Sequence, residues 1–331
     1  MKAPILQISR HRINTDGDGI FTLVGFMGCP LSCAYCINDL CHSNDPADIQ
    51  YNVTPEELFD LVKIDNLYFQ ATNGGITFGG GEPGLYSEFI EEFTKIMSPA
   101  WKINLETSLN YPQEHLRRLM PVINHFYVDI KTLDKDMYRQ YTGGNIQPVL
   151  ENLELLKAEG LAEKTTVRTP HIPEYTTFKA DKESQEKLKE MGFNDLETLW
   201  YVKDKNVKED KNGKLICDLL KAYRSMISKQ ENKPSWFKPC SYNGPCCGTC
   251  SLCDKEITSI QMNIDPTYRQ MVVDAKDFPK PSKKLATEYR KIGTMGVLRN
   301  TPFLFPLKIE EFMEQRIECF VKELNDKANT Y

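Results

Sequence analysis

Short apolar runs alternate with amphipathic segments from residue 20 to about residue 203. Six runs have the length and composition of buried strands: IFTLVGFMG, GITFGGGEP, KINLETS, HFYVDIK, TTVRTPHIP and LETLWYVK. Five segments between them have helical spacing: TPEELFDLVKIDNLYFQ, YSEFIEEFTKIM, QEHLRRLMPVI, VLENLELLKAEG and KESQEKLKEMG. This alternation predicts right-handed β-α-β units and a parallel sheet.

The polar and glycine-rich segments of this alternation fall at the ends of the predicted strands. Cysteines follow the first strand, GGGEP follows the second and ETS the third, while DIK and RTPHIP lie at the ends of the next two. Ligands of parallel sheets bind at the carboxyl ends of the strands, so these segments should meet at one site. His171 is the histidine best placed at this edge, and we expect it to make a structural hydrogen bond there.

The alternation stops near residue 204. The remainder holds a charged segment, the helical segments LICDLLKAYRSMISKQ and KIEEFMEQRIECFVKELNDK, and a second group of cysteines. We therefore predict an α/β protein with two parts. Residues 1–203 form a partial (β/α)6 barrel of the TIM type, and residues 204–331 form a small, cysteine-rich C-terminal extension.

Composition narrows the class of protein. Apolar residues make up 40% of the chain and charged residues 26%, as in ordinary globular proteins. The net charge of −5, without a basic stripe, favours no nucleic-acid partner. No apolar run is long enough to span a membrane and the start lacks a signal-peptide pattern, so we expect no membrane partner and a cytoplasmic location. In that reducing compartment, eleven cysteines indicate metal or redox chemistry.

Three cysteines, Cys29, Cys33 and Cys36, follow the first strand with the spacing C-x3-C-x2-C. A cubane iron–sulfur cluster normally takes four thiolates, so three would leave one iron open to another ligand. The alternative is a zinc site completed by His42 or Cys41. That closed site would give the GGGEP segment at the same sheet edge no purpose. The pattern therefore favours a [4Fe–4S] cluster with one open iron.

The three cysteines, with Tyr35 before the last of them and GGGEP about forty residues later, resemble the radical S-adenosylmethionine (SAM) superfamily over about residues 10–200. The resemblance implies that SAM chelates the open iron through its amino and carboxylate groups. It implies that the reduced cluster cleaves SAM to methionine and a 5′-deoxyadenosyl radical, which abstracts a hydrogen atom from the substrate. It also implies an electron donor such as a flavodoxin or ferredoxin, and oxygen-sensitive chemistry that requires anaerobic work.

The same resemblance assigns cofactor-binding roles. Gly80, Gly81 and Glu82 would meet the methionine amino group, and Tyr35 would flank the adenine. It also implies roles for residues at the ends of later strands. Asp129 and Lys131 would contact polar groups of the cofactor, and Arg168 would pair with its carboxylate. From the residues alone, these last three also fit an ion-pair network at a strand edge.

Four longer segments are similar to glycyl-radical-enzyme activating enzymes, which modify a glycine Cα in a protein loop: NTDGDGIFTLVGFMGCPLSCAYCIN, GITFGGGEP, DIKTLDKDMYRQYTGGN and VRTPHIPEYT. The usual DGPGIRT is DGDGIFT here, and the usual DTNG begins with Glu106. In that family the aspartate of DTNG helps to hold a cation near the cofactor carboxylate, which makes Glu106 a cofactor-site candidate. The resemblance implies a protein or peptide substrate. A small metabolite is the alternative, and a non-catalytic iron–sulfur or zinc protein is a third.

Cys246, Cys250 and Cys253 repeat the C-x3-C-x2-C spacing near the end of the chain. No predicted strand and no GGE motif follow them, and Cys240 and Cys247 add enough thiols to fill a fourth position. We predict a fully ligated second [4Fe–4S] cluster, with a structural zinc site as the alternative. Spacing does not show which of the neighbours Cys246 and Cys247 is the cluster ligand. Such extensions resemble those of radical enzymes that modify ribosomal peptides, so a peptide-modifying role stands beside activation.

Overall fold

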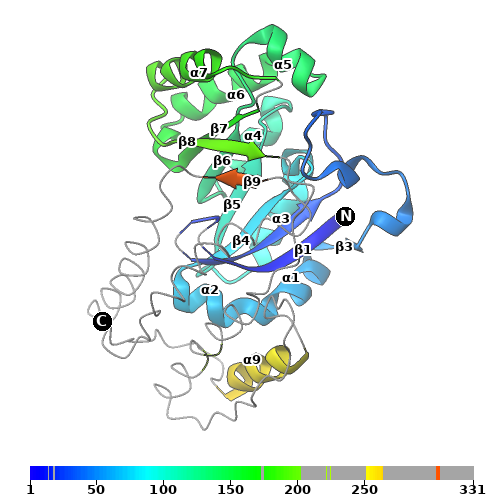
Figure 1. Ribbon diagram of the computed structural model, residues 1–331. Helices are drawn as coiled ribbons and strands as arrows, with labels where there is room; N and C mark the ends of the chain where they lie inside the picture. The colour runs from blue at the N-terminus through cyan, green and yellow to red at the C-terminus, as the bar shows by residue number, and fades with distance from the viewer. Residues whose placement is uncertain are drawn as a thin grey trace, which may run out of the picture.

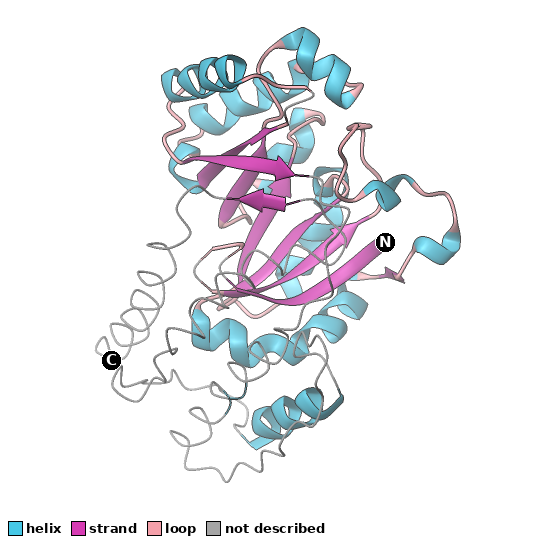
Figure 2. Cartoon of the chain, in the orientation of Figure 1, coloured by secondary structure: helices cyan, strands magenta, loops and turns pink. Residues whose placement is uncertain are grey.

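The computed structural model describes residues 1–202 except positions 14, 18, 173 and 174, residues 221 and 224, and the segments 251–263 and 303–305. These residues form one curved sheet with helices around its outer face (Figures 1 and 2). The predicted boundary at residue 203 and the helix KIEEFMEQRIECFVKELNDK lie outside the described residues, and LICDLLKAYRSMISKQ does so except at Lys221 and Arg224. The division into two domains therefore stays a prediction.

The sheet has nine described strands in the order β3-β1-β2-β4-β5-β6-β7-β8-β9. Six of them run parallel, each beside its neighbour along the chain. Their bounds are β2 Ile20–Phe26, β4 Gly75–Gly80, β5 Lys102–Thr107, β6 His125–Asp129, β7 Thr165–His171 and β8 Leu196–Val202. These are the six predicted strands, so the partial-barrel α/β fold is confirmed.

Three antiparallel strands extend the parallel set at its two edges. The strand β1 (Ala3–Ile13) pairs with β2 on one side and with β3 (Tyr51–Val53) on the other, and β9 (Phe303–Phe305) pairs with β8. The sequence analysis predicted none of them. The two short strands have three residues each, which is too few for a periodicity to stand out.

The helices lie between the parallel strands, as the alternation predicts. The predicted helix TPEELFDLVKIDNLYFQ is divided by a 3-10 turn, and two of the described helices, α5 and α9, were not predicted. The bounds are α1 Pro55–Val62, η3 Lys63–Asp65, α2 Asn66–Thr72, α3 Ser87–Ile96, α4 Gln113–Leu119, α5 Lys135–Thr142, α6 Gln147–Ala158, α7 Phe178–Glu190 and α9 Ser251–Asn263. A capping box at Thr54 and Glu57 starts α1, as its sequence predicts.

A bulge in β1 sends its side chains to two faces of the sheet. The register against β2 shifts between Ser9 and Arg12, and His11 has a positive φ of 60°. Arg10 consequently reaches the helix layer on the outside, where it meets Asp65 of η3, while Arg12 reaches the barrel interior. This single irregularity lets one strand serve both the outer layer and the interior.

The core is a continuous layer between the sheet and its helices, built from fully buried side chains such as Phe26, Phe78 and Phe126. These residues sit on the outward face of their strands, which leaves the inward face free for polar groups. Among the described residues, no helix combines the length and the apolar character that crossing a membrane requires.

Candidate active site

The cysteine loop leaves β2 at Gly28, whose φ of 81° suits glycine. Backbone hydrogen bonds fix this loop at three points. Gly28 N donates to Cys41 O at 2.7 Å, while Ser32 N and Ala34 N donate to the end of α5, to Thr142 O at 2.8 Å and Tyr141 O at 2.9 Å. The loop is therefore closed on itself and anchored to the DIKTLDKDMYRQYTGGN segment.

The loop brings the three predicted thiols into mutual electrostatic range. Burial raises the pKa of the Cys29 thiol to about 12, and charges on Glu82, Cys33 and Cys36 add to that rise. Burial also raises the pKa of Cys33, against the effect of the Lys131 ammonium. All three side chains are partly exposed, so a metal cluster can reach them. Three sulfur donors on one half-buried loop fit an iron–sulfur cluster with one iron left open.

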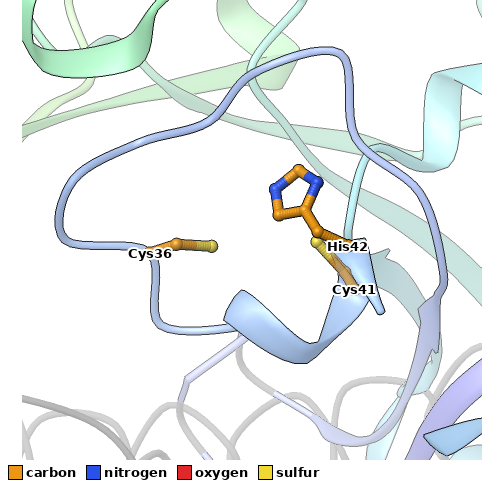
Figure 3. A group of neighbouring side chains, drawn as sticks. All are labelled: Cys36, Cys41 and His42. Atoms are coloured by element: carbon orange, nitrogen blue, oxygen red, sulfur yellow. The ribbon is translucent and has the colours of Figure 1, made fainter. Parts of the chain in front are cut away.

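Cys41 and His42 place two further metal-binding atoms beside Cys36 (Figure 3). The three ligand atoms lie within 4.8 Å of one another, with Cys41 buried and His42 exposed. The hydrogen bond from the Cys41 thiol lowers the pKa of Cys36. These are the two residues that the sequence offers for a closed zinc site, and both lie beside the motif cysteine Cys36.

The GGGEP segment is joined to the cysteine loop by its backbone. Gly81 N donates to Phe26 O and Glu82 N donates to Gly28 O, both at 2.8 Å. A Cβ at Gly80 would lie 2.6 Å from Gly25 Cα, and one at Gly81 would lie 2.0 Å from Gly28 O. The glycines are therefore needed for the close contact between the ends of β2 and β4.

The buried Glu82 carboxylate holds this turn against the end of β5. One oxygen accepts from Gly84 N at 3.0 Å and from the Thr107 hydroxyl at 2.6 Å. The other accepts from Ser108 N at 2.9 Å and from the Ser108 hydroxyl at 2.6 Å. Four donors occupy the roughly four lone-pair positions of a carboxylate. An ammonium group can bind Glu82 only by replacing one of them.

A buried ion network lines the barrel interior below this edge. Oε1 of Glu106 lies 3.1 Å from Nη2 of Arg12 and 3.1 Å from Nη1 of Arg168. Arg12 also binds the fully buried Asp16 at 2.6 Å. Burial raises the pKa of the Glu106 carboxyl, and the two guanidinium groups oppose that shift. Two cations already face Glu106, so repulsion disfavours a metal ion on the same oxygen.

Arg168 is held from several sides. Its Nε donates to Glu197 at 3.1 Å, its Nη2 donates to the Thr15 carbonyl at 3.0 Å, and its guanidinium carbon lies 4.2 Å from the centre of the Tyr127 ring. The side chain is only 13% exposed. A rigid, largely desolvated arginine is well suited to bind a carboxylate, because little freedom is lost on binding.

The remaining predicted residues lie near the cysteine loop. Lys131 Nζ lies 3.7 Å from Asp129 Oδ2. Burial lowers the pKa of Lys131, but Asp129 and the neighbouring Tyr141 and thiol groups raise it above its usual value. The Tyr35 ring packs edge-on against Tyr175, with ring centres 5.7 Å apart. A fixed ammonium and a pair of aromatic rings therefore lie beside the thiols.

Comparison with known proteins identifies this arrangement. The profile described as "Radical SAM superfamily" matches residues 23–179. The Pyruvate formate-lyase 2-activating enzyme of Escherichia coli (strain K12) is 30% identical, over 53% of this chain and 68% of its own. The chain belongs to the radical SAM superfamily.

Other relatives are also activating enzymes. The Indoleacetate decarboxylase activating enzyme of Tractidigestivibacter scatoligenes is 32% identical over 38% of this chain, and the chain spans 39% of its length. A crystal structure of Streptococcus suis SuiB bound to S-adenosylmethionine matches with 15% identity and a TM-score of 0.43, covering 62% of this chain and 46% of that one. That structural likeness is too weak to bear on function.

Membership in the superfamily implies a [4Fe–4S] cluster and SAM, and it makes this chain a radical SAM enzyme. The predicted family, fold class and enzyme class are therefore confirmed. The thiols of Cys29, Cys33 and Cys36 fit the cluster, and the backbone-joined GGGEP turn lies beside them.

The sequence analysis missed the interior residues that share an ion and hydrogen-bond network with the candidate residue Glu106. Arg12 and Asp16 precede the first parallel strand, and Asn104 donates to the Asp16 carbonyl at 2.6 Å. The alternation of β5, whose residues 104 and 106 share a face, offered a signal for Asn104. Nothing in the spacing marked Arg12, because its direction depends on the bulge at His11.

The second cysteine group lies almost wholly outside the described residues. Cys240, Cys246, Cys247 and Cys250 are not described, whereas Cys253 is buried in α9.

His171 makes a hydrogen bond to Asp181, the structural contact expected for it.

Proposed function

We propose that this radical SAM enzyme activates a partner protein by abstracting a hydrogen atom from a glycine Cα. The observation that carries the proposal is the match to an activating enzyme at 30% identity over 68% of that relative's length. The chain spans only 39% and 38% of the next two relatives, an activating enzyme for a decarboxylase and one for a dehydratase. Activity and substrate of the whole protein are therefore proposals.

We assign roles to the residues of the cysteine loop and its surroundings from their positions in the structure. Cys29, Cys33 and Cys36 would bind three irons, and their protons leave when the metal binds. The bound cluster and SAM supply the radical chemistry, given one electron from a donor. The Lys131 ammonium beside two of the thiols would offset the negative charge of the thiolate-bound cluster.

The cofactor contacts are proposed on the same geometry. The GGGEP backbone at Gly80 and Gly81 would meet the methionine amino group, with Glu82 fixing the turn through its four hydrogen bonds. Tyr35, packed on Tyr175, would flank the adenine.

Two further contacts belong to the proposal. Arg168 would pair with the cofactor carboxylate, and Asp129 with Lys131 would meet its other polar groups. Glu106 would act by holding Arg12 and Arg168 in place, because both guanidinium groups already contact its oxygen.

The partners follow from this activity. We propose a glycyl-radical protein as the substrate, a flavodoxin or ferredoxin as the electron donor, and a cytoplasmic location without nucleic-acid or membrane partners. A second [4Fe–4S] cluster at the C-terminal cysteines also belongs to the proposal. Modification of a ribosomal peptide is the second candidate function, and the C-terminal cysteine group favours it.

The test begins with anaerobic reconstitution. We expect about eight irons per chain if two cubane clusters form, and reductive cleavage of SAM to 5′-deoxyadenosine. Mixing with a purified glycyl-radical protein should give a protein radical detectable by electron paramagnetic resonance. Triple alanine replacement of Cys29, Cys33 and Cys36 should abolish cleavage and leave only the second centre.

Two results would contradict the proposal. SAM cleavage by the triple variant would refute the cluster site. SAM cleavage without a glycyl radical, together with a mass change in a short precursor peptide, would show that the enzyme modifies peptides and does not activate a glycyl-radical protein.

A further inference from the structure

The segment that follows the last motif cysteine carries two further metal-binding side chains, Cys41 and His42. Both belong to η1 (Asp39–His42), a short 3-10 helix just beyond the motif. Backbone hydrogen bonds hold this helix against the cysteine loop. Cys41 N donates to Asn38 O at 2.8 Å, and Cys41 O accepts from Gly28 N at 2.7 Å. Cys41 is therefore fixed between the end of β2 and the end of the motif.

Cys36, Cys41 and His42 bring three ligand atoms together on this loop. The atoms lie within 4.8 Å of one another, and the Cys36 sulfur points toward the other two side chains (Figure 3). Bonds of about 2.3 Å to sulfur and about 2.0–2.1 Å to nitrogen place the ligands of a tetrahedral zinc ion roughly 3.5–3.8 Å apart. A contraction of no more than about 1.3 Å would therefore bring all three atoms within bonding distance of one ion.

The chemistry of these three side chains suits zinc. Thiolate and imidazole are the ligands of most zinc sites in proteins. Each thiol gives up its proton when the metal binds and the imidazole binds as a neutral ligand, so two thiolates would balance the charge of one Zn²⁺. Cys41 is buried and His42 is exposed, so the group is anchored on one side and open to solvent on the other. A water molecule would take the fourth position of the ion.

A single zinc ion and the iron–sulfur cluster would both need the Cys36 sulfur. The cluster takes Cys36 together with Cys29 and Cys33, whereas the single ion takes it together with Cys41 and His42. A thiolate that binds zinc is not available to an iron of the cluster. The two metal states of the loop therefore exclude each other.

We propose that Cys36, Cys41 and His42 form a binding site for a single Zn²⁺ ion in the protein before its cluster is built. Zinc at this site withholds Cys36 from cluster assembly, so the supply of zinc and iron decides how much of the protein becomes active enzyme. The inference rests on the proposed cluster site through Cys36 alone, and zinc binding does not depend on the proposed substrate.

The first experiment titrates Co²⁺, a spectroscopic probe for zinc sites, into the full-length protein purified anaerobically without iron. Five C-terminal cysteines are first replaced by alanine so that they bind no metal: Cys240, Cys246, Cys247, Cys250 and Cys253. We expect about one Co²⁺ per chain, with sulfur-to-cobalt absorption.

Loss of an outer partner of a metal ligand costs about 10–100-fold in metal affinity, so loss of a ligand should cost at least as much. In the same protein, His42→Ala and Cys41→Ser should therefore weaken Co²⁺ binding by at least about 10-fold. Cys33→Ser is the matched control, because it removes a thiol of the same loop that the single ion does not use. It should leave the affinity for Co²⁺ unchanged.

The second experiment measures competition between the two metal states. Zn²⁺ added before iron and sulfide should slow assembly of the first cluster, followed by its visible absorbance. In His42→Ala, at least about 10-fold more zinc should be needed for the same inhibition. Without zinc, this variant should assemble the cluster and cleave SAM at the wild-type rate, because the exposed His42 is not a cluster ligand. His115→Ala, at a histidine of α4, should be inhibited by zinc as the wild type is.

The outcomes separate this inference from the proposed activity. A Co²⁺ affinity that falls in Cys33→Ser and not in His42→Ala would overturn it, because the motif cysteines would then hold the ion. Equal inhibition by zinc in His42→Ala and in the wild type would also overturn it. His42 is exposed, so its variants keep the test valid even if Cys41→Ser does not fold. The proposed activity fails separately, when the zinc-free enzyme cleaves SAM and forms no glycyl radical.

Discussion

At the scale of single residues, the site depends on buried polar groups that bind several partners at once. Glu82 accepts four hydrogen bonds, and one oxygen of Glu106 faces two guanidinium groups. Such residues hold neighbouring parts in place, because removing one acceptor strands its donors in a region that water does not reach. Their contribution to cofactor binding is therefore largely indirect.

Glu82→Gln provides a test of this view. Each carboxylate oxygen accepts from one backbone N–H, of Gly84 or of Ser108, so the amide nitrogen would face a group that cannot accept and at least one buried hydrogen bond is lost. We expect the free energy of unfolding to fall by about 1–3 kcal/mol, with weaker SAM binding measured by calorimetry. Glu88→Gln, on the exposed face of α3, is the control and should change neither. Unchanged stability in Glu82→Gln would show that these four bonds are dispensable.

Cluster assembly at the first motif should depend on pH. Burial raises the pKa of Cys29 to about 12, and the metal binds the deprotonated thiol. Protons therefore compete with iron below that pKa, and assembly should speed up from about pH 7 to about pH 8.5. The measurement is the visible absorbance of the growing cluster in a variant whose five C-terminal cysteines, 240, 246, 247, 250 and 253, are all replaced by alanine, so that this group binds no iron. A rate independent of pH would mean that the thiols are already ionised.

At the scale of elements, an ion cluster on the outside of the sheet joins β1, η3 and α9, because Arg10 binds Asp65 at 2.7 Å and Asp254 at 2.9 Å. Burial alone would raise the pKa of Asp65, but the charges and hydrogen bonds of His11 and Arg10 bring it well below its usual range. A carboxyl whose pKa is lower in the folded state stabilises the protein above its unfolded pKa. That stability is lost as the pH falls through the folded value.

Asp65→Asn should therefore be strongly destabilising. It leaves the charge of Arg10 largely buried without its main partner, which costs about 3–5 kcal/mol. Asp60→Asn is matched to it, since Asp60 pairs with Lys63 on the exposed surface and should change stability by less than about 0.5 kcal/mol. Denaturant unfolding at neutral and acidic pH measures both. Equal stability of the two variants would show that the ion cluster contributes nothing.

The sequence predicted those elements whose pattern is local. The six parallel strands and their helices followed from apolar runs and capping residues such as Thr54. The strand β1 was missed because its alternation is broken at His11, where a bulge changes the face of the following residues. The helix α5 was missed because its polar sequence KDMYRQYT has few apolar positions, and Asp134 caps it from the loop.

At the scale of the whole molecule, the site is an assembly of separate chain segments. The cysteine loop, GGGEP, the end of β5 and the end of α5 are joined by backbone and side-chain hydrogen bonds. The sequence predicted that these segments meet, because parallel strands share one edge. It did not predict Arg12, Asp16 or the links through Arg10, since those depend on tertiary contacts between distant residues.

The contact between the end of α5 and the cysteine loop offers a test of this assembly. A Cβ at Gly144 would lie 2.3 Å from Cδ2 of the buried Leu31, so Gly144→Ala forces this side chain of the cysteine loop out of its packed position. A displacement of about 1 Å in a site can cost up to about 100-fold in rate. We expect SAM cleavage to fall between about 10- and 100-fold, with less iron at the first centre and an unchanged second centre.

Gly160→Ala separates this local effect from a general loss of stability. Gly160 has a φ of 71°, so alanine there costs about 1–2 kcal/mol of backbone strain. Nothing lies within 4 Å of the added Cβ. Gly160 follows α6 and is therefore outside both the cysteine loop and the end of α5 that anchors it. This variant should unfold more easily and still assemble its first centre and cleave SAM at the wild-type rate. If both glycine variants lose iron equally, cluster assembly follows overall stability, and the anchoring of the loop by α5 has no special role.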